Sequence, residues 1–240
     1  MNQSLFSAPG EIYERHIELC IDRLELILPI FLNTLKRILS INESSQIESA
    51  LRKMILYHDL GKLTKRWQEN LGKRALPSHS TIGASLLFKI LPENLREPIS
   101  FAVSIHHTDR GIYGENIERP DVQAILDEIV DHSGKIIWDE KAYKLEKELF
   151  PDELKKLTVY DLREMAEGLR VWAKGNSILQ QHKRRLQAML CHHILKLCDI
   201  SAASERKEYQ REDEEDYYGG WLMVEEIKRY VENKTNAFRR

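Results

Sequence analysis

The adjacent residues His58 and Asp59 offer a metal ion two ligands from neighbouring backbone positions. Gly61 and Lys62 follow, in the order His-Asp-Leu-Gly-Lys. Because glycine is a natural helix stop, the helix that carries the pair is expected to end just past it. Asp59 and Lys62 are then expected at the mouth of a pocket, where a carboxylate and an amine can take part in chemistry.

The helix that leads to this pair is predicted from its cap and its apolar spacing. Ser45 and Glu48 have the spacing of a capping box, which marks a helix start. The buried face is then expected to carry Ile47, Leu51, Met54 and His58, at intervals of four, three and four residues. His58 is therefore predicted to point inward.

Four further histidines are expected on helices with apolar neighbours. They are His16, His79, His106 and His107. The first lies on the inward face of a predicted helix over residues 11–39, which Pro29 is expected to kink. Ser78 is of a residue type preferred at helix N-caps, which places His79 in the first turn of a helix. Another helix is expected to start at Pro98 and to end at the adjacent pair, whose two side chains cannot both enter one core.

Asp199 is a carboxylate on the otherwise apolar inward face of a long predicted helix, over residues 177 to about 206. A buried carboxylate needs a partner, and a metal ion is the best one available. Asp131 and Asp161 are rival candidates for the same role, although neither lies on so apolar a face.

Imidazole and carboxylate ligands together favour Mn, Fe, Ni, Co or Zn, and a carboxylate that bridges two ions also admits Mg. One site would be filled by His16, His58, Asp59 and Asp199. A second would be filled by His79, His106 and His107, with Asp59 as the bridge. Two ions about 3.5–4 Å apart activate a water for in-line displacement at phosphorus, so the ligand set favours phosphoester hydrolysis. Lys62 is placed to neutralise a phosphate oxygen or to help position the nucleophile.

A basic segment over residues 62–74 surrounds one indole side chain. Its candidate phosphate contacts are Lys65, Arg66, Lys73 and Arg74, with Trp67 as a candidate stacking platform for a base. A solvated amphipathic turn is the alternative interpretation. Arg110, in a glycine-bounded loop over residues 108–114, is a further candidate for holding phosphate.

The composition indicates a globular protein without a strong charge bias. The chain has 240 residues and 28.2 kDa, 42% hydrophobic residues and a net charge of −2. Any contact with nucleic acid must therefore come from a local patch or from bound metal. Three cysteines without CxxC spacing are typical of buried free thiols in a reducing compartment. With no secretory start and no apolar run of membrane-spanning length, a soluble cytoplasmic protein is expected.

The helical periodicities, with almost no period-two alternation, predict an all-α fold over one domain, residues 1–240. Residues 1–10 are expected to form a loose lead-in. The stretch at about 115–178 is the least informative, with helical patterns at 122–130 and 138–150 and a charge run at 139–156 that favours a solvated face. A final amphipathic helix is predicted at about 221–233.

The ordered set of motifs resembles the HD phosphohydrolase superfamily. The resemblance rests on His16, the His-Asp-x-Gly-Lys motif at residues 58–62, His79, the pair at 106–107 and Asp199 in the segment Leu-Cys-Asp-Ile-Ser. It spans roughly residues 11–110 and 180–206. Within the superfamily, the chain is similar to the stand-alone CRISPR-associated HD nucleases of type I interference systems.

This resemblance implies a helical HD bundle with a metal site in its core cleft and a family-divergent insertion at about 115–178. It implies two divalent ions, with Mn, Ni, Co, Fe or Mg as candidates, on the two ligand sets given above, and Lys62 as the motif lysine. It further implies endonucleolytic or 3′–5′ exonucleolytic cleavage of single-stranded DNA. The implied partners are a superfamily 2 helicase subunit and an RNA-guided CRISPR effector complex.

Two other functions remain as alternatives. One is an HD-family nucleotide phosphohydrolase, such as a dNTPase, a cyclic-dinucleotide phosphodiesterase or a (p)ppGpp hydrolase. The double histidine also occurs in the cyclic-dinucleotide group, whose further Gly-Tyr-Pro motif is missing here. The other is a non-catalytic assembly module in which a structural metal holds the helices together.

Overall fold

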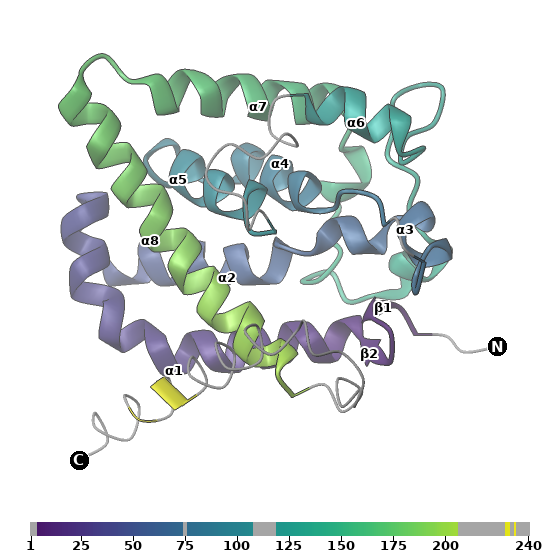
Figure 1. Ribbon diagram of the computed structural model, residues 1–240, viewed down its shortest axis with the longest axis horizontal. Coiled ribbons are helices and arrows are strands. Elements are labelled where there is room, and N and C mark those ends of the chain that lie inside the picture. Colours follow the sequence, from purple (N-terminus) through teal and green to yellow (C-terminus); the bar gives the residue numbers. More distant parts are fainter. Residues whose placement is uncertain (1–3, 74–75, 108–118, 206–228, 231–232, 234–240) are drawn as a thin grey trace, which may run out of the picture.

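The computed structural model describes residues 4–73, 76–107, 119–205, 229–230 and 233. Helices make up most of this part of the chain (Figure 1). Its named strands are one short antiparallel pair, β1 (Phe6–Ala8) and β2 (Glu11–Ile12). The predicted all-α class is confirmed, apart from this hairpin. None of the described helices has both the length and the apolar character needed to cross a membrane.

The expected loose lead-in over residues 1–10 is wrong for its described part. Leu5 and Ala8 are buried, at 2% and 7% exposure. Because Glu11 belongs to the hairpin, helix α1 (Tyr13–Leu39) begins two residues later than predicted. The hairpin thus packs the start of the chain next to the first turn of α1, the turn that carries His16.

Helix α1 is the long amphipathic helix that the sequence predicts, with Pro29 in its interior. Proline removes one helical hydrogen bond and is a common cause of kinks. Figure 1 shows α1 changing direction along its length. Its apolar face is fully buried at Ile27 and Leu35, so both halves of the helix contribute to the core.

Helix α2 (Ser44–Tyr57) leads to the His-Asp pair, and the 3-10 helix η1 (Leu60–Leu63) follows it. The predicted capping box is wrong, because α2 begins one residue before Ser45. The Ser45 hydroxyl donates to the Glu43 carboxylate at 2.9 Å instead of capping the helix. The pair therefore lies where the backbone changes from an α-helix to a 3-10 helix.

Helices α4 (Ser80–Ile90) and α5 (Glu93–Ser104) supply the next histidines, and their starts differ from those predicted. His79, and not Ser78, is the N-cap of α4, and the Ser78 amide donates to the Asp127 carboxylate at 3.1 Å. Pro98 lies inside α5 and does not begin it. That helix starts directly after Pro92, which ends the preceding connection.

The stretch after residue 119 contains α6 (Pro120–Leu126), the 3-10 helices η3 (Glu140–Lys144) and η4 (Leu154–Lys156), and α7 (Val159–Lys174). The predicted helix over 138–150 is wrong. Trp138 and Phe150 are buried and pack edge to face at 5.3 Å, so this charged stretch also contributes to the core. Its backbone joins η1, because the Asp139 amide donates to Leu63 at 3.0 Å.

Helix α8 (Ile178–Ala203) confirms the long helix that the sequence predicts, with Ser177 as its N-cap. It packs against α1 and α5, while α4 packs against α5 and α7, and α1 against α2 (Figure 1). The predicted helix at about 221–233 lies mostly outside the described residues. Those described within it, at 229, 230 and 233, are helical.

Two glycines let α4 approach the His-Asp pair. A Cβ atom at Gly61 would lie 2.3 Å from the carbonyl oxygen of His79, and one at Gly83 would lie 1.9 Å from the carbonyl oxygen of Tyr57. Both obstacles are backbone atoms, which cannot move alone. Gly61 therefore does more than end a helix: it allows His79 to lie close to the motif.

We expect Gly83→Ala to lower the free energy of unfolding by about 1–3 kcal/mol, because α4 must move away from Tyr57 to admit a methyl group. Chemical denaturation measures the change. Gly168→Ala is the matched control, since the added methyl group would meet only the ring of Phe88, which can move. Equal stability of the Gly83 variant and the wild type would contradict the close approach.

Candidate metal centre

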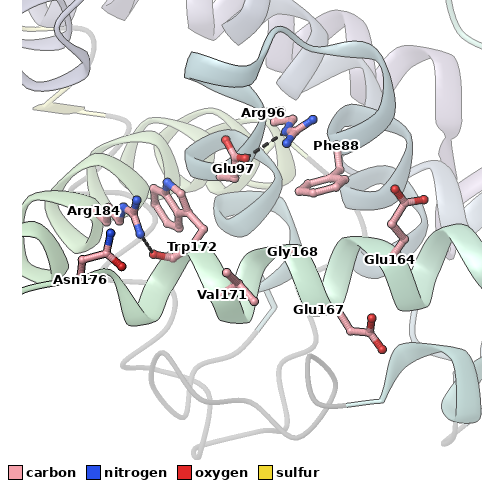
Figure 2. A pocket seen from close by; sticks show the side chains of 10 residues that line it. All are labelled: Phe88, Arg96, Glu97, Glu164, Glu167, Gly168, Val171, Trp172, Asn176 and Arg184. Atoms are coloured by element: carbon pink, nitrogen blue, oxygen red, sulfur yellow. Dashed lines mark hydrogen bonds and ion pairs between the residues drawn. The ribbon is translucent and has the colours of Figure 1, made fainter.

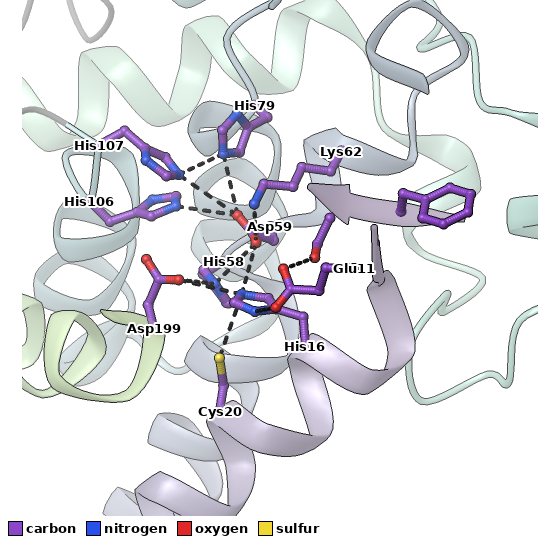
Figure 3. Close-up of polar contacts among 12 residues, drawn as sticks. Glu11, His16, Cys20, His58, Asp59, Lys62, His79, His106, His107 and Asp199 are labelled. Atoms are coloured by element: carbon purple, nitrogen blue, oxygen red, sulfur yellow. Dashed lines mark hydrogen bonds and ion pairs between the residues drawn. The ribbon is translucent and has the colours of Figure 1, made fainter. Parts of the chain in front are cut away.

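The structure brings all seven predicted ligands together (Figure 3). They are His16 from α1, His58 and Asp59 from the α2–η1 junction, His79 from the start of α4, His106 and His107 after α5, and Asp199 from α8. Five segments far apart in the sequence therefore meet at one point inside the helical bundle.

The carboxylate of Asp59 lies at the middle of the cluster and faces two ways. Its Oδ2 atom lies 3.4 Å from Nε2 of both His16 and His58. Its Oδ1 atom lies 3.3 Å from Nε2 of His79 and 3.5 Å from Nε2 of His106. Each oxygen therefore faces a different set of imidazoles, as a bridging carboxylate would.

Two groups of residues have ligand atoms that all lie within 4.8 Å of one another. They are His16, Cys20, His58 and Asp199, and Asp59, His79, His106 and His107. The second group is the predicted one. The first contains Cys20, which the sequence marked only as a buried thiol, while Asp59 contacts the histidines of both groups.

The donor atoms fit divalent metal ions. Nε2 of His58, Nε2 of His106 and both oxygens of Asp59 are buried without a hydrogen bond of good geometry in the protein. The Nδ1 atoms of His58 and His106 lie 2.7 Å and 2.6 Å from the carbonyl oxygens of Ile55 and Val103. These bonds hold the proton on Nδ1 and leave the Nε2 lone pair facing the cluster.

The protonation states of His79, His106 and Asp59 favour the same conclusion. Burial lowers the pKa of His79 to about 4 and that of His106 to about 3, so both imidazoles are neutral at pH 7. Burial opposes ionisation of Asp59, but His58 and Lys62 hold its pKa well below its usual value. Neutral imidazoles and ionised carboxylates are the forms that bind divalent transition metals.

Lys62 and Trp67 form one wall of the cluster. The Lys62 ammonium lies 2.7 Å from Oδ2 of Asp59 and 5.7 Å from the centre of the Trp67 ring. The indole packs edge to face against His79 and is only 2% exposed. The prediction of Trp67 as a stacking platform is therefore wrong, because no base can reach its face.

The predicted basic contacts are only partly described. Lys65 and Arg66 belong to α3 (Lys65–Glu69), where their side chains are 59% and 42% exposed, and Lys73 is exposed as well. Arg74 and Arg110 lie outside the described residues. The two rivals of Asp199 have other roles: Asp161 completes a capping box at the start of α7, and Asp131 holds an exposed turn.

Glu11 contacts the site through His16, and sequence reasoning missed this contact. Its Oε1 atom lies 3.2 Å from Nδ1 of His16, and its Oε2 atom accepts a hydrogen bond from the Ser7 hydroxyl. A carboxylate on the outer nitrogen of a ligand histidine fixes the ring and its tautomer. The only sequence signal for this contact is that Glu11 lies five residues before His16. The hairpin, which was not predicted, brings the two side chains together.

A separate surface pocket lies between α4, α5, α7 and α8 and contains none of the seven ligands (Figure 2). Three glutamates and two arginines line it, together with Phe88 and Trp172. Arg96 stacks over Phe88 and pairs with Glu97 at 2.9 Å. Both arginines already contact other groups, and three carboxylates would repel a phosphate. This pocket therefore does not supply a site for a phosphate chain.

Residues 31–166 match the family model of the HD domain. The match covers more than half of the chain and includes the motif pair and the three histidines that follow it. The chain therefore belongs to the HD domain family, a superfamily of metal-dependent phosphohydrolases. No curated protein matches the sequence. His16 and Asp199 lie outside the matched range, so α1 and α8 complete the cluster from either side of it.

We expect Glu11→Gln to weaken metal binding by about 10–100-fold, because the amide holds the His16 ring less firmly in its ligand orientation. Calorimetric titration of chelator-treated protein with Mn²⁺ measures the affinity. Glu18→Gln, an exposed change on α1, is the matched control. Wild-type affinity in the Glu11 variant would show that the Glu11–His16 contact does not support the ligand.

We also expect the metal-free protein to lose stability as the pH falls from about 6.5 toward 4. The pKa values of His79 and His106 are about 4 and 3 in the folded chain, against 6.5 when unconstrained, so the unfolded chain binds more protons in this window. Each histidine then removes up to about 1.4 kcal/mol per pH unit. Urea denaturation of chelator-treated protein between about pH 7 and 5 measures the slope.

In the variant His106→Gln, the free energy of unfolding should depend less steeply on pH, because the imidazole at position 106 has been removed. His132→Gln, which changes an exposed histidine, should keep the wild-type slope. The assignment fails if both variants and the wild type lose stability equally with acid.

Proposed function

We propose that this protein is a divalent-metal-dependent nuclease that hydrolyses phosphodiester bonds in single-stranded DNA. The observation that carries the proposal is the Asp59 carboxylate, whose two oxygens face two separate ligand groups. Ions held by these two groups would supply an activated water and would stabilise both the attacking and the leaving oxygen at phosphorus. The protein residues then orient the substrate and hold the charges in place.

Lys62 is the residue best placed to act on the substrate phosphate. Its ammonium lies beside the bridging carboxylate, and its side chain is only 7% exposed. A cation held in a water-poor site stabilises developing charge on a phosphoryl oxygen without needing to reorganise. The ammonium also lies over the Trp67 ring, at 5.7 Å from its centre, in a cation–π contact.

The second ligand group is the one open to substrate. The His107 side chain is 43% exposed and that of His79 is 15% exposed, whereas those of His16 and His58 are fully buried. A phosphodiester therefore approaches from the side of His79 and His107. The bulk of the chain shields the opposite side of Asp59 from solvent.

A substrate with a long backbone is supported by the basic residues of α3. Lys65 and Arg66 follow the motif and directly precede Trp67, which packs on His79. Each also pairs with a glutamate, at 3.8 Å to Glu69 and 3.0 Å to Glu128. Phosphates that displace these surface pairs would make binding dependent on salt.

The ordered motif set also supports a role in CRISPR interference, because it resembles the stand-alone HD nucleases of type I systems. In that role the protein would act beside a superfamily 2 helicase and an RNA-guided effector complex. The single strand exposed by that complex would be its substrate.

The test is cleavage of end-labelled single-stranded DNA by purified protein with Mn²⁺, Ni²⁺, Co²⁺ or Mg²⁺. Asp59→Asn should reduce cleavage to the metal-free background, because it removes the bridging charge at constant size. Lys62→Met should slow cleavage by about 10²–10³-fold. Asp22→Asn, on the exposed face of α1, is the control and should cleave normally.

The same assay includes a panel of nucleotides as competing substrates. If nucleotides were hydrolysed while the DNA stayed intact, the proposed nuclease function would be wrong, and the protein would be a nucleotide phosphohydrolase of the same family. Turnover of neither substrate, with metal bound, would favour a structural metal in an assembly module.

A further inference from the structure

Cys20 lies one helical turn after His16 on α1 and points into the metal centre (Figure 3). The residue is fully buried, and its Sγ atom lies 3.6 Å from Nε2 of His16. Its sulfur also lies within 4.8 Å of the ligand atoms of His58 and Asp199. We propose that Cys20, as a thiolate, is a ligand of the ion held by these three residues, an assignment that rests on the two-ion site of the proposed function.

Two of the separations between ligand atoms match a metal ion with tetrahedral ligands, while Nε2 of His58 lies farther from Oδ1 of Asp199, at 3.9 Å. Bonds of about 2.1 Å to nitrogen and about 2.3 Å to sulfur, at the tetrahedral angle, separate the two ligand atoms by about 3.6 Å. This is the observed separation of His16 Nε2 and Cys20 Sγ. Nitrogen and oxygen ligands at about 2.1 Å would be about 3.4 Å apart, and His16 Nε2 lies 3.4 Å from Oδ1 of Asp199.

The orientation of the histidines also supports a metal ion beside Cys20. Nδ1 of His16 faces the carboxylate of Glu11, which can accept its proton and leave the Nε2 lone pair free. Nε2 of His58 is buried and has no hydrogen-bond partner in the protein. Two imidazole nitrogens and a sulfur thus converge on the same small volume, where a cation would satisfy all three.

With Cys20 as a ligand, the two ions differ in how much of their positive charge the protein neutralises. A thiolate at Cys20 and the carboxylate of Asp199 together neutralise one divalent ion. The other ion has neutral histidines and a carboxylate of Asp59 that it shares with the first ion, so it keeps positive charge on the side where His107 is exposed. The thiol proton leaves to solvent as the sulfur–metal bond forms. A soft sulfur ligand selects Zn²⁺, Co²⁺ or Fe²⁺ over Mg²⁺ at the inner position.

Cobalt spectroscopy of the full chain tests the assignment without any nuclease assay. Chelator-treated protein is titrated with Co²⁺, whose visible bands report binding and whose near-ultraviolet charge-transfer band reports a thiolate ligand. The band is expected in the wild type and in Cys191→Ser, which changes a buried cysteine of α8 that belongs to neither ligand group. Cys20→Ser should lose it and keep visible bands.

The proposal is overturned if the wild type binds Co²⁺ without the charge-transfer band, or if Cys20→Ser retains that band. Should the variant not fold, X-ray absorption of the Zn²⁺-loaded wild type gives the same answer. A sulfur neighbour at about 2.3 Å supports the assignment, and a shell of nitrogen and oxygen alone refutes it. A thiolate band in a protein that hydrolyses neither DNA nor nucleotides would refute the proposed function while leaving Cys20 as a ligand.

Discussion

The buried negative charge of Asp59 is the constraint on which the rest of the structure depends. An isolated carboxylate in a protein core is strongly unfavourable, so its oxygens must have partners on every side. The partners come from α1, α4 and the end of α5, together with Lys62 from the adjacent 3-10 helix. Each of these elements must reach within about 4 Å of one carboxylate, which fixes how the helices pack.

The two sides of this carboxylate differ in kind. The His16 and His58 side is dry, with its outer hydrogen bonds made to Glu11 and to a backbone carbonyl. The His79 and His107 side reaches the surface. A rigid inner half and an accessible outer half suit a site that must hold its own geometry while exchanging substrate for product.

Much of this centre could be predicted because its ligands lie on helices whose apolar spacing shows which way each side chain points. His58 and Asp199 are the clearest cases, since each shares a face with buried residues. Helix ends were predicted less well. At Ser78 and Pro98 local preference indicates a helix start, but α4 begins after His79 and α5 begins after Pro92.

Side-chain contacts made outside the long helices could not be predicted from the spacing of apolar residues. Trp67 was expected to be exposed because its neighbours are charged, yet the short helix α3 turns the indole toward His79. Glu11 became a partner of His16 only through a hairpin whose strands are too short to leave a period-two pattern. The expectations for Arg74 and Arg110 concern residues that the structure does not describe.

The positions of His16 and Asp199 have a consequence for how the protein is made. One lies near the start of α1 and the other near the end of α8, yet they approach within 3.4 Å. Contacts between such distant parts of a chain form late in folding, because a long loop must close first. The cluster that contains both residues is therefore complete only after α8 has been synthesised and docked on α1. A nascent chain therefore lacks the full set of candidate ligands until the whole helical core is assembled.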